Sequence, residues 1–286
     1  MPSLTGIRRR IKSAGNISQI TKAMEMVSAS KMRKAQDAAL SSRPFTSKLE
    51  EIMSRVAGHA GEFTHPLMEK QKHRSTVMMI VVATDKGLCG GLNVNLLRAV
   101  TDWASRTPDV KIDLVGVGKR AKSTIPGRSV DLMAKFHSLG ENPSFEETRA
   151  IARLAMESFL SGAVQEVYIA YPKFISTLQN EPVIKQLLPM IQADSVDVVT
   201  SDYQFEPSPR SLIEQLVPYQ VEMSIYQMLI EARASEHSSR MVAMKSASDN
   251  ASDLINNLTL DYNQARQSAV TTELLDATTA RMALQE

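Results

Sequence analysis

The feature that most constrains this chain is the absence of glycine and proline from its C-terminal part. Neither residue occurs between Tyr219 and Glu286, a span of 68 residues, and all 12 glycines lie before residue 163. In a helix interior glycine costs about 1 kcal/mol and proline about 3 kcal/mol relative to alanine. A continuous helix of this span would be roughly 100 Å long, several times the diameter of a small domain. The sequence therefore predicts one very long C-terminal helix.

A second helix-forming stretch lies near the N-terminus. The segment QITKAMEMVSASKMRKAQ, Gln19 to Gln36, contains no glycine, proline or aromatic residue, and its only acid is Glu25. Residues 1–36 hold eight basic side chains and one acidic one, a net charge of +7, whereas residues 212–286 hold five basic and ten acidic ones, a net charge of −5. Because the two arms have opposite charge, we expect them to lie against each other.

Apolar residues in both arms recur at intervals of three and four, in narrow stripes typical of coiled coils. Two surface helices packed on a globular core would need broader apolar faces. Small residues at Ser28–Ser30, and at Ala232, Ser235, Ser239, Ala243 and Ala247, would let the two backbones approach closely. The predicted stripe positions are Ile7, Ile11, Ile17, Ile20, Met24 and Val27 in the first arm, and Val217, Val221, Ile225, Met228, Ala232, Leu254, Leu258, Tyr262, Ala265 and Ala269 in the second.

The middle of the chain alternates strand-like and helix-like segments, which favours a small α/β domain with a mostly parallel sheet. The predicted fold class is therefore α/β: a long antiparallel coiled coil of the N- and C-terminal helices plus a small central Rossmann-like domain. We predict an N-terminal helix over residues 1–58, a linker over 59–75, the α/β domain over 76–209 and a C-terminal helix over 210–286. Strands are expected at Thr76–Ala83, Lys111–Val117, Ser129–Phe136 and Glu166–Tyr171, helices through Trp103 and over Phe145–Leu160, and an irregular hairpin over Pro172–Pro189.

Composition and motifs indicate no catalytic centre, cofactor or metal site. The sequence contains no run of about 18 apolar residues, so it predicts no membrane span. A single cysteine allows no intramolecular disulfide. The turn TDKGLCGGLN, Thr84 to Asn93, stands where a phosphate-binding loop would, but its glycines match neither nucleotide-binding pattern. Because the position of this turn still fits a nucleotide site, a nucleotide-binding α/β enzyme with helical dimerisation arms is kept as an alternative function. So is a nucleic-acid adaptor, although residues 1–44 offer no stacking aromatics and no Trp or Phe for a membrane surface.

Four motifs together resemble the γ subunit of bacterial-type F-type ATP synthase. They are QITKAMEMVSASKMRKAQ, TDKGLCGGLN, ASEHSSRMVAMKSASDNA and YNQARQSAVTTEL. Their order and spacing cover essentially the whole chain. The resemblance implies a non-catalytic rotor shaft that couples proton-driven rotation of the c-ring to the three catalytic β subunits, and that regulates ATPase activity and proton flow. It also implies contacts with the α3β3 ring and the ε subunit, no nucleic-acid partner, no membrane insertion and a place on the cytoplasmic face of the bacterial plasma membrane.

The resemblance also carries residue roles to matching positions. Near the catalytic lever of β it places Lys22, Met24 and Glu25, with Lys86 and Cys89 lower down. It places Arg266 and Gln267 against a β loop at the upper bearing. The foot that faces ε and the c-ring would contain Tyr203, Phe205 and Glu206.

Overall fold

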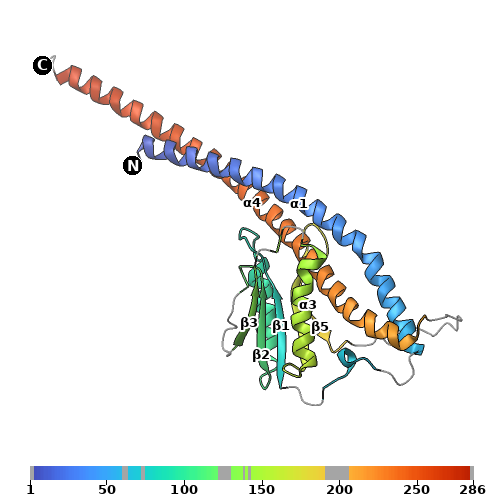
Figure 1. Ribbon diagram of the computed structural model, residues 1–286. Helices are drawn as coiled ribbons and strands as arrows, with labels where there is room; N and C mark the ends of the chain where they lie inside the picture. The colour runs from blue at the N-terminus through green and yellow to red at the C-terminus, as the bar shows by residue number, and fades with distance from the viewer. Residues whose placement is uncertain are drawn as a thin grey trace. The chain divides into compact units, whose positions relative to one another are not determined.

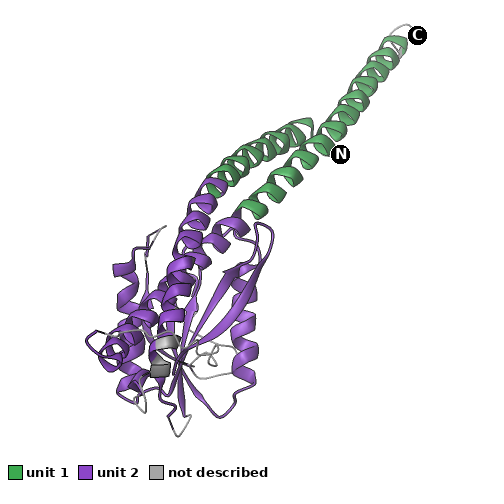
Figure 2. Cartoon of the chain, turned by 90° about the vertical axis from the view of Figure 1, so that its right-hand side faces the viewer, with its two compact units in different colours: residues 1–28, 241–286 green, residues 29–240 purple. Residues whose placement is uncertain are grey.

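The computed structural model describes residues 3–59, 64–71, 75–121, 130–137, 139–140, 143–190 and 206–283. The chain divides into two compact units, residues 1–28 with 241–286 (unit 1) and residues 29–240 (unit 2; Figure 2). Helices α1 (Leu4–His59) and α4 (Pro209–Ala283) are 56 and 75 residues long, and each contributes to both units. The prediction of two long terminal helices is confirmed. The four-segment division stays a prediction, because the units divide both helices part-way along.

Unit 1 consists of the first part of α1 and the last part of α4, which run antiparallel so that the two chain ends point the same way (Figure 1). The Arg8 guanidinium donates a 2.7 Å hydrogen bond to the Tyr262 hydroxyl and lies 5.5 Å from the centre of that ring. The residues of α1 that are buried in this unit recur every seven positions, as in a coiled coil. They are Ile7, Ala14, Thr21 and Ser28, and the α4 residues Met244, Ser248, Ala251 and Leu258 are buried with them.

The stripe predicted for α1 was wrong at Ile17, Ile20 and Val27. Ile7 is buried and Ile11 half-buried, but Ile17, Ile20 and Val27 are 53%, 60% and 53% exposed. Small and polar residues take the buried positions instead, because they let the two helices approach closely. In α4, Leu258 is buried as predicted, whereas Leu254 is 45% exposed.

The two helices also pair within unit 2. There the Ser42 hydroxyl donates to the Gln227 side chain, and Gln227 Nε2 donates to the Ala39 carbonyl at 3.3 Å. Further along, Ala35 packs with Ala234 and Phe174. Since higher residue numbers of α1 meet lower ones of α4, the pairing is antiparallel. Ala35 and Ala234 are small, but neither is among the positions predicted for the close approach of the two helices, so that call stays a prediction.

The rest of unit 2 is a five-stranded sheet in the order β3-β2-β1-β4-β5 (Figure 1). The first four strands in that order are parallel, and β5 pairs antiparallel with β4. The predicted strands are confirmed, except that Ser129 lies outside the described residues. The predicted irregular hairpin is an antiparallel β4–β5 pair whose register shifts between Val167 and Tyr168. The elements are η1 (Pro66–Met68), β1 (Thr76–Val82), α2 (Leu92–Ser105), β2 (Lys111–Val117), β3 (Val130–Phe136), α3 (Phe145–Leu160), β4 (Glu166–Phe174) and β5 (Asn180–Leu188).

Both faces of this sheet are covered, which explains why β1 is apolar throughout. Met78 and Ile80 point into a core shared with α3, the end of α1 and the first part of α4. Met79 and Val81 point the other way, into a core closed by α2. The predicted apolar face of α4 from Val217 to Ala232 belongs to the first core, and all five of its predicted positions are buried. The early part of α4 is therefore a core helix of the α/β unit, and the prediction of a coiled-coil stripe that packs on the N-terminal arm alone was wrong for this part of the helix.

Candidate functional site

The most unusual part of unit 2 is a run of buried polar side chains on α4. Between residues 231 and 240, Ser235 is 0% exposed, and Glu236, His237, Ser238 and Arg240 are also buried. A buried charge is tolerated only when it is paired and hydrogen-bonded. Each buried charge in this run is therefore expected to have a hydrogen-bonded partner of opposite charge.

Arg233 and Arg240 connect α4 to the loop that follows β1. The Arg233 guanidinium donates to Asp85 Oδ2 at 3.1 Å, to Glu236 Oε2 at 2.8 Å and to the Leu139 carbonyl at 2.9 Å. Arg240 donates to Glu236 Oε1 at 2.7 Å and to the carbonyls of Lys86 and Gly87, each at 3.3 Å. Burial alone would lower the pKa of Arg233, but Glu236 and Asp85 outweigh it, so its pKa is raised above the ordinary value. Arg233 therefore stays charged inside the fold.

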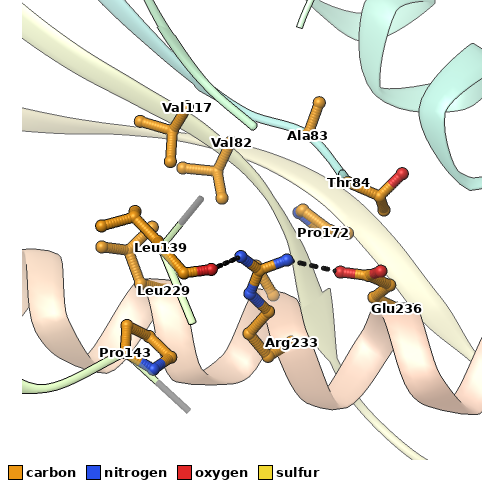
Figure 3. Close-up of a pocket in the computed structure, with 11 residues that line it drawn as sticks. Val82, Ala83, Thr84, Val117, Leu139, Pro143, Pro172, Leu229, Arg233 and Glu236 are labelled. Carbon is orange, nitrogen blue, oxygen red and sulfur yellow. Dashed lines mark hydrogen bonds and ion pairs between the residues drawn. The ribbon is translucent and has the colours of Figure 1, made fainter. Parts of the chain in front are cut away.

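The same residues line a small pocket at the carboxyl ends of the parallel strands (Figure 3). In Figure 3, Arg233 extends from α4 towards these strand ends, with Leu139 and Glu236 as its hydrogen-bonded partners. In open α/β sheets this edge is where ligands bind. The strands contribute Val82, Val117 and Pro172, and the segment directly after β1 contributes Ala83 and Thr84. The segment after β3 contributes Leu139 and Pro143, and α4 contributes Leu229, Ala232, Arg233 and Glu236.

The loop Thr84–Gly91 has a fixed internal structure. The Thr84 hydroxyl donates to the Lys86 carbonyl at 2.7 Å, and Asn93 Nδ2 donates to the Thr84 hydroxyl at 2.8 Å. Leu88 adopts a φ of 62°, a left-handed conformation, and its side chain is 61% exposed. Lys86 is exposed, whereas the Cys89 thiol is 3% exposed and lies 3.4 Å from Asn93 Nδ2. Of the two residues predicted here as lever contacts, Lys86 has an exposed side chain and Cys89 a buried one.

Unit 1 holds two other groups of predicted contact residues. Lys22 forms a 3.0 Å ion pair with Glu25, whose side chain is 17% exposed, and Met24 between them is half-buried. Arg266 and Gln267 are both exposed on α4. These groups belong to separate stretches of the helix pair, and each has surface available to another protein.

The predicted foot residues are only partly described. Glu206 is exposed just before α4, whereas Tyr203 and Phe205 lie outside the described residues. All of these contact roles remain predictions. The Arg233 contacts were not predicted, although the polar run EARASEHSSR inside a long helix signals that this face does not pack on an apolar core.

A pH effect is expected from His237, which is 5% exposed. Burial lowers its pKa; Glu236 opposes that effect, and Arg240, Lys31 and Arg233 reinforce it. A group whose pKa is lowered on folding stabilises the fold above its unfolded pKa, about 6.5, and loses that contribution as pH falls. We therefore expect the free energy of unfolding of the full chain to fall between pH 7.5 and pH 5.5, roughly the range over which histidine titrates.

The measurement is urea unfolding followed by circular dichroism. His237→Gln should weaken this pH dependence, whereas His137→Gln, at an exposed position, should leave it unchanged. Equal pH slopes for the wild type and His237→Gln would show that burial of this imidazole has no such role.

Two further properties bear on possible activities. Among the described residues, no helix is both long and apolar enough to cross a membrane. Within the same residues, no group of three or more histidine, cysteine, aspartate or glutamate side chains is placed to hold a metal ion.

Comparison with known proteins identifies the family. The ATP synthase family model matches residues 3–284. The ATP synthase gamma chain of Dehalococcoides mccartyi is 40% identical over 278 residues, which cover 96% of this chain and 97% of that protein. The chain belongs to the ATP synthase gamma chain family. The gamma chain of Pelotomaculum thermopropionicum is 39% identical over 286 residues, with 100% of both chains covered.

Solved structures agree with this assignment. One similar chain comes from the cryo-EM structure of the Tetrahymena thermophila mitochondrial ATP synthase central stalk and c-ring. It is 28% identical with a TM-score of 0.59, and the match covers 80% of the present chain and 99% of the Tetrahymena chain. A chain of the Euglena gracilis mitochondrial ATP synthase has a TM-score of 0.66, and the match covers 98% of the present chain and 94% of the Euglena chain. At 17% identity, this second likeness concerns the fold alone. The fold with long terminal helices and a central parallel-dominated sheet therefore agrees with that of these two chains.

Proposed function

We propose that this chain is the central rotor shaft of an F-type ATP synthase, and that it couples rotation of the c-ring to conformational cycling of the three catalytic β subunits. The observation that carries this function is the antiparallel pairing of α1 and α4 in a chain that matches ATP synthase gamma chains along its whole length. The Tetrahymena relative is part of a central stalk with a c-ring. The α3β3 ring, the ε subunit and the c-ring are accordingly the proposed partners, on the cytoplasmic face of a bacterial plasma membrane.

In the proposed mechanism the chain makes and breaks no covalent bond. It acts by contacting one conformation of each β subunit more favourably than the other. A protein that binds another shifts its conformational equilibrium only by the difference in its affinity for the two states. Moving a β site from 1:99 to 99:1 would require about 5.5 kcal/mol of such preference. A shaft that delivers energies of this order must resist bending. The glycine- and proline-free part of α4 suits that requirement.

The proposed contact residues fall into three groups, each facing a different partner surface. Lys22, Met24 and Glu25 would face the β lever, and Lys86 would face it from the loop after β1. Arg266 and Gln267 would meet a β loop at the upper bearing. The segment with Tyr203, Phe205 and Glu206 would form the foot. The division into N-terminal helix, linker, α/β domain and C-terminal helix is proposed on the same grounds.

Met24→Lys tests the lever contact. A lysine would place a new cation on the surface of α1 that is proposed to face β. We expect ATP hydrolysis to continue, while proton pumping per ATP falls by about twofold or more, because the shaft then favours the wrong lever state. Pumping and hydrolysis are measured together in inverted membrane vesicles. Met26→Lys makes the same change at a side chain that is 61% exposed and should leave the ratio unchanged. Unchanged pumping per ATP in the Met24 variant would remove Met24 from the contact.

The assignment itself is tested by affinity purification of the tagged full chain from detergent-solubilised membranes. Mass spectrometry should identify the α, β and ε subunits and the c-ring protein in the purified complex. A chain recovered without those subunits, or with a different set of proteins, would contradict the proposed function.

A further inference from the structure

The crevice at the carboxyl ends of the parallel strands is filled by a helix of the same chain. The chain passes from β1 to β2 to β3 on one side of the sheet and places β4 on the other side of β1, which creates a switch point beside β1. Folds of this type bind nucleotides in the crevice there. In this chain Leu229, Ala232 and Arg233 of α4 line that pocket. The position that a small ligand would take in a nucleotide-binding relative is thus held by α4.

Arg233 makes this docking specific, because it contacts two different strand-end segments at once. It donates to Asp85, directly after β1, and to the Leu139 carbonyl, after β3. The other carboxylate oxygen of Asp85 accepts from the Lys119 backbone N–H at 3.0 Å, so Asp85 also connects the loops after β1 and β2. The Arg233 and Asp85 side chains are 12% and 20% exposed, which limits competition by water.

Glu236 joins Arg233 to the second anchor of the loop. Its two carboxylate oxygens bind Arg233 and Arg240, and Arg240 also donates to the carbonyls of Lys86 and Gly87. The network of two arginines and two carboxylates has no net charge, and it contacts the loop at its first three residues after Thr84. The next residue, Leu88, projects its exposed side chain in a left-handed turn.

We propose that α4 occupies the place of a ligand at the strand ends of the α/β domain, and that Arg233 is a positioning residue. Arg233 fixes the loop Thr84–Gly91 to α4, so that the loop and the helix move together. The loop then presents Lys86 and Leu88 to a partner at a constant position relative to the helix. The structural part of this inference is independent of the rotor function. Its consequence for coupling rests on that proposed function.

Cys89, the only cysteine of the chain, reports directly on this loop. Its buried thiol reacts with a maleimide only when the loop opens locally, so its labelling rate measures how firmly the loop is held. The experiment labels the purified complex under native conditions and quantifies modified Cys89 by mass spectrometry, which separates it from thiols of other subunits. We expect Arg233→Met to raise the labelling rate by about tenfold or more. Arg233→Lys, which keeps the charge, should label more slowly than Arg233→Met.

A matched control removes a different arginine of unit 2, one that pairs two helices and does not contact the loop. Arg149 of α3 pairs with Glu222 of α4 at 3.3 Å, away from the loop. Arg149→Met should change Cys89 labelling by less than about twofold, because the loop contacts remain. Circular dichroism and recovery of the assembled complex show whether each variant is folded.

A double-mutant cycle identifies the partner of Arg233. Asp85→Asn should also speed labelling, and the double variant Arg233→Met/Asp85→Asn should label no faster than the faster single variant. Multiplicative effects would show that the two residues act independently, and this would overturn the proposal. Wild-type labelling in a folded Arg233→Met variant would overturn it as well.

The functional consequence has a separate readout. If loop and helix move together during rotation, Arg233→Met should lower proton pumping per ATP in vesicles while ATP hydrolysis continues. Faster labelling with unchanged pumping would confirm the positioning role and remove its consequence for coupling. Failure to co-purify with ATP synthase subunits would instead count against the rotor function, and leave the labelling result standing.

Discussion

Proline at position 243 is expected to break α4 and to uncouple ATP hydrolysis from proton pumping. Ala243 lies in the interior of this helix, within unit 1. Proline would remove one backbone hydrogen bond and clash with the preceding turn, at a cost of about 3 kcal/mol or more. Urea unfolding of the full chain measures the loss of stability. The ratio of pumping to hydrolysis in vesicles measures the loss of coupling.

Two features of the chain sharpen this test. Ala243→Ser keeps the size and the backbone hydrogen bond, so this control should behave much like the wild type. The helices do contain Pro44 and Pro218, but both lie within unit 2. Normal assembly and pumping in Ala243→Pro would mean that torque does not require an unbroken helix at this point.

Gly118→Ala is expected to be the most damaging small substitution in the α/β unit. Gly118 has a φ of +90°, and a Cβ atom there would lie 2.3 Å from the Ala83 carbonyl oxygen. The obstacle is backbone at the end of β1, so no side-chain rotation relieves it. Left-handed strain adds about 1–2 kcal/mol for alanine. We expect the free energy of unfolding to fall by about 3 kcal/mol or more, as for other substitutions that force backbone strain and overpacking.

Two other glycines separate strain from collision. Gly162 has a φ of +75°, but no atom of the described residues lies within 4 Å of the place that a Cβ atom would take. Gly162→Ala should therefore cost only the strain, about 1–2 kcal/mol. Gly15 is helical and has similar open space, so Gly15→Ala should stabilise the chain by up to about 1 kcal/mol. If Gly118→Ala unfolds no more easily than Gly162→Ala, the close approach to Ala83 is not rigid.

The main elements of the fold could be predicted because each has a strong local cause. The absence of glycine and proline after residue 218 indicated the long reach of α4, and the apolar run in β1 indicated a strand buried on both faces. The burial of α4 from Val217 to Ala232 was also predicted from its apolar spacing, although as a coiled-coil stripe, whereas these residues belong to the core of the α/β unit. In all three cases the information lies within one continuous stretch of sequence.

The helix seam and the polar contacts could not be predicted in the same way. Ala14 and Thr21 are buried because two helices approach closely, and such small side chains give little apolar signal; of the buried α1 residues in unit 1 after Ile7, only Ser28 was predicted, as a small residue at the close approach. Ile17 and Ile20 gave that signal and are exposed. The pairing of Asp85 with Arg233 joins residues far apart in sequence, and nothing local to either residue indicates the other.

The rotor function is tested most directly by watching the chain turn. Asp109, exposed in the turn before β2, can be replaced by cysteine and biotinylated to carry a bead, because the native Cys89 is buried. Complexes are immobilised through their β subunits and supplied with ATP. Continuous rotation of the bead in one direction is the expected result. A bead that only fluctuates about a fixed angle, on complexes that still hydrolyse ATP, would contradict the account.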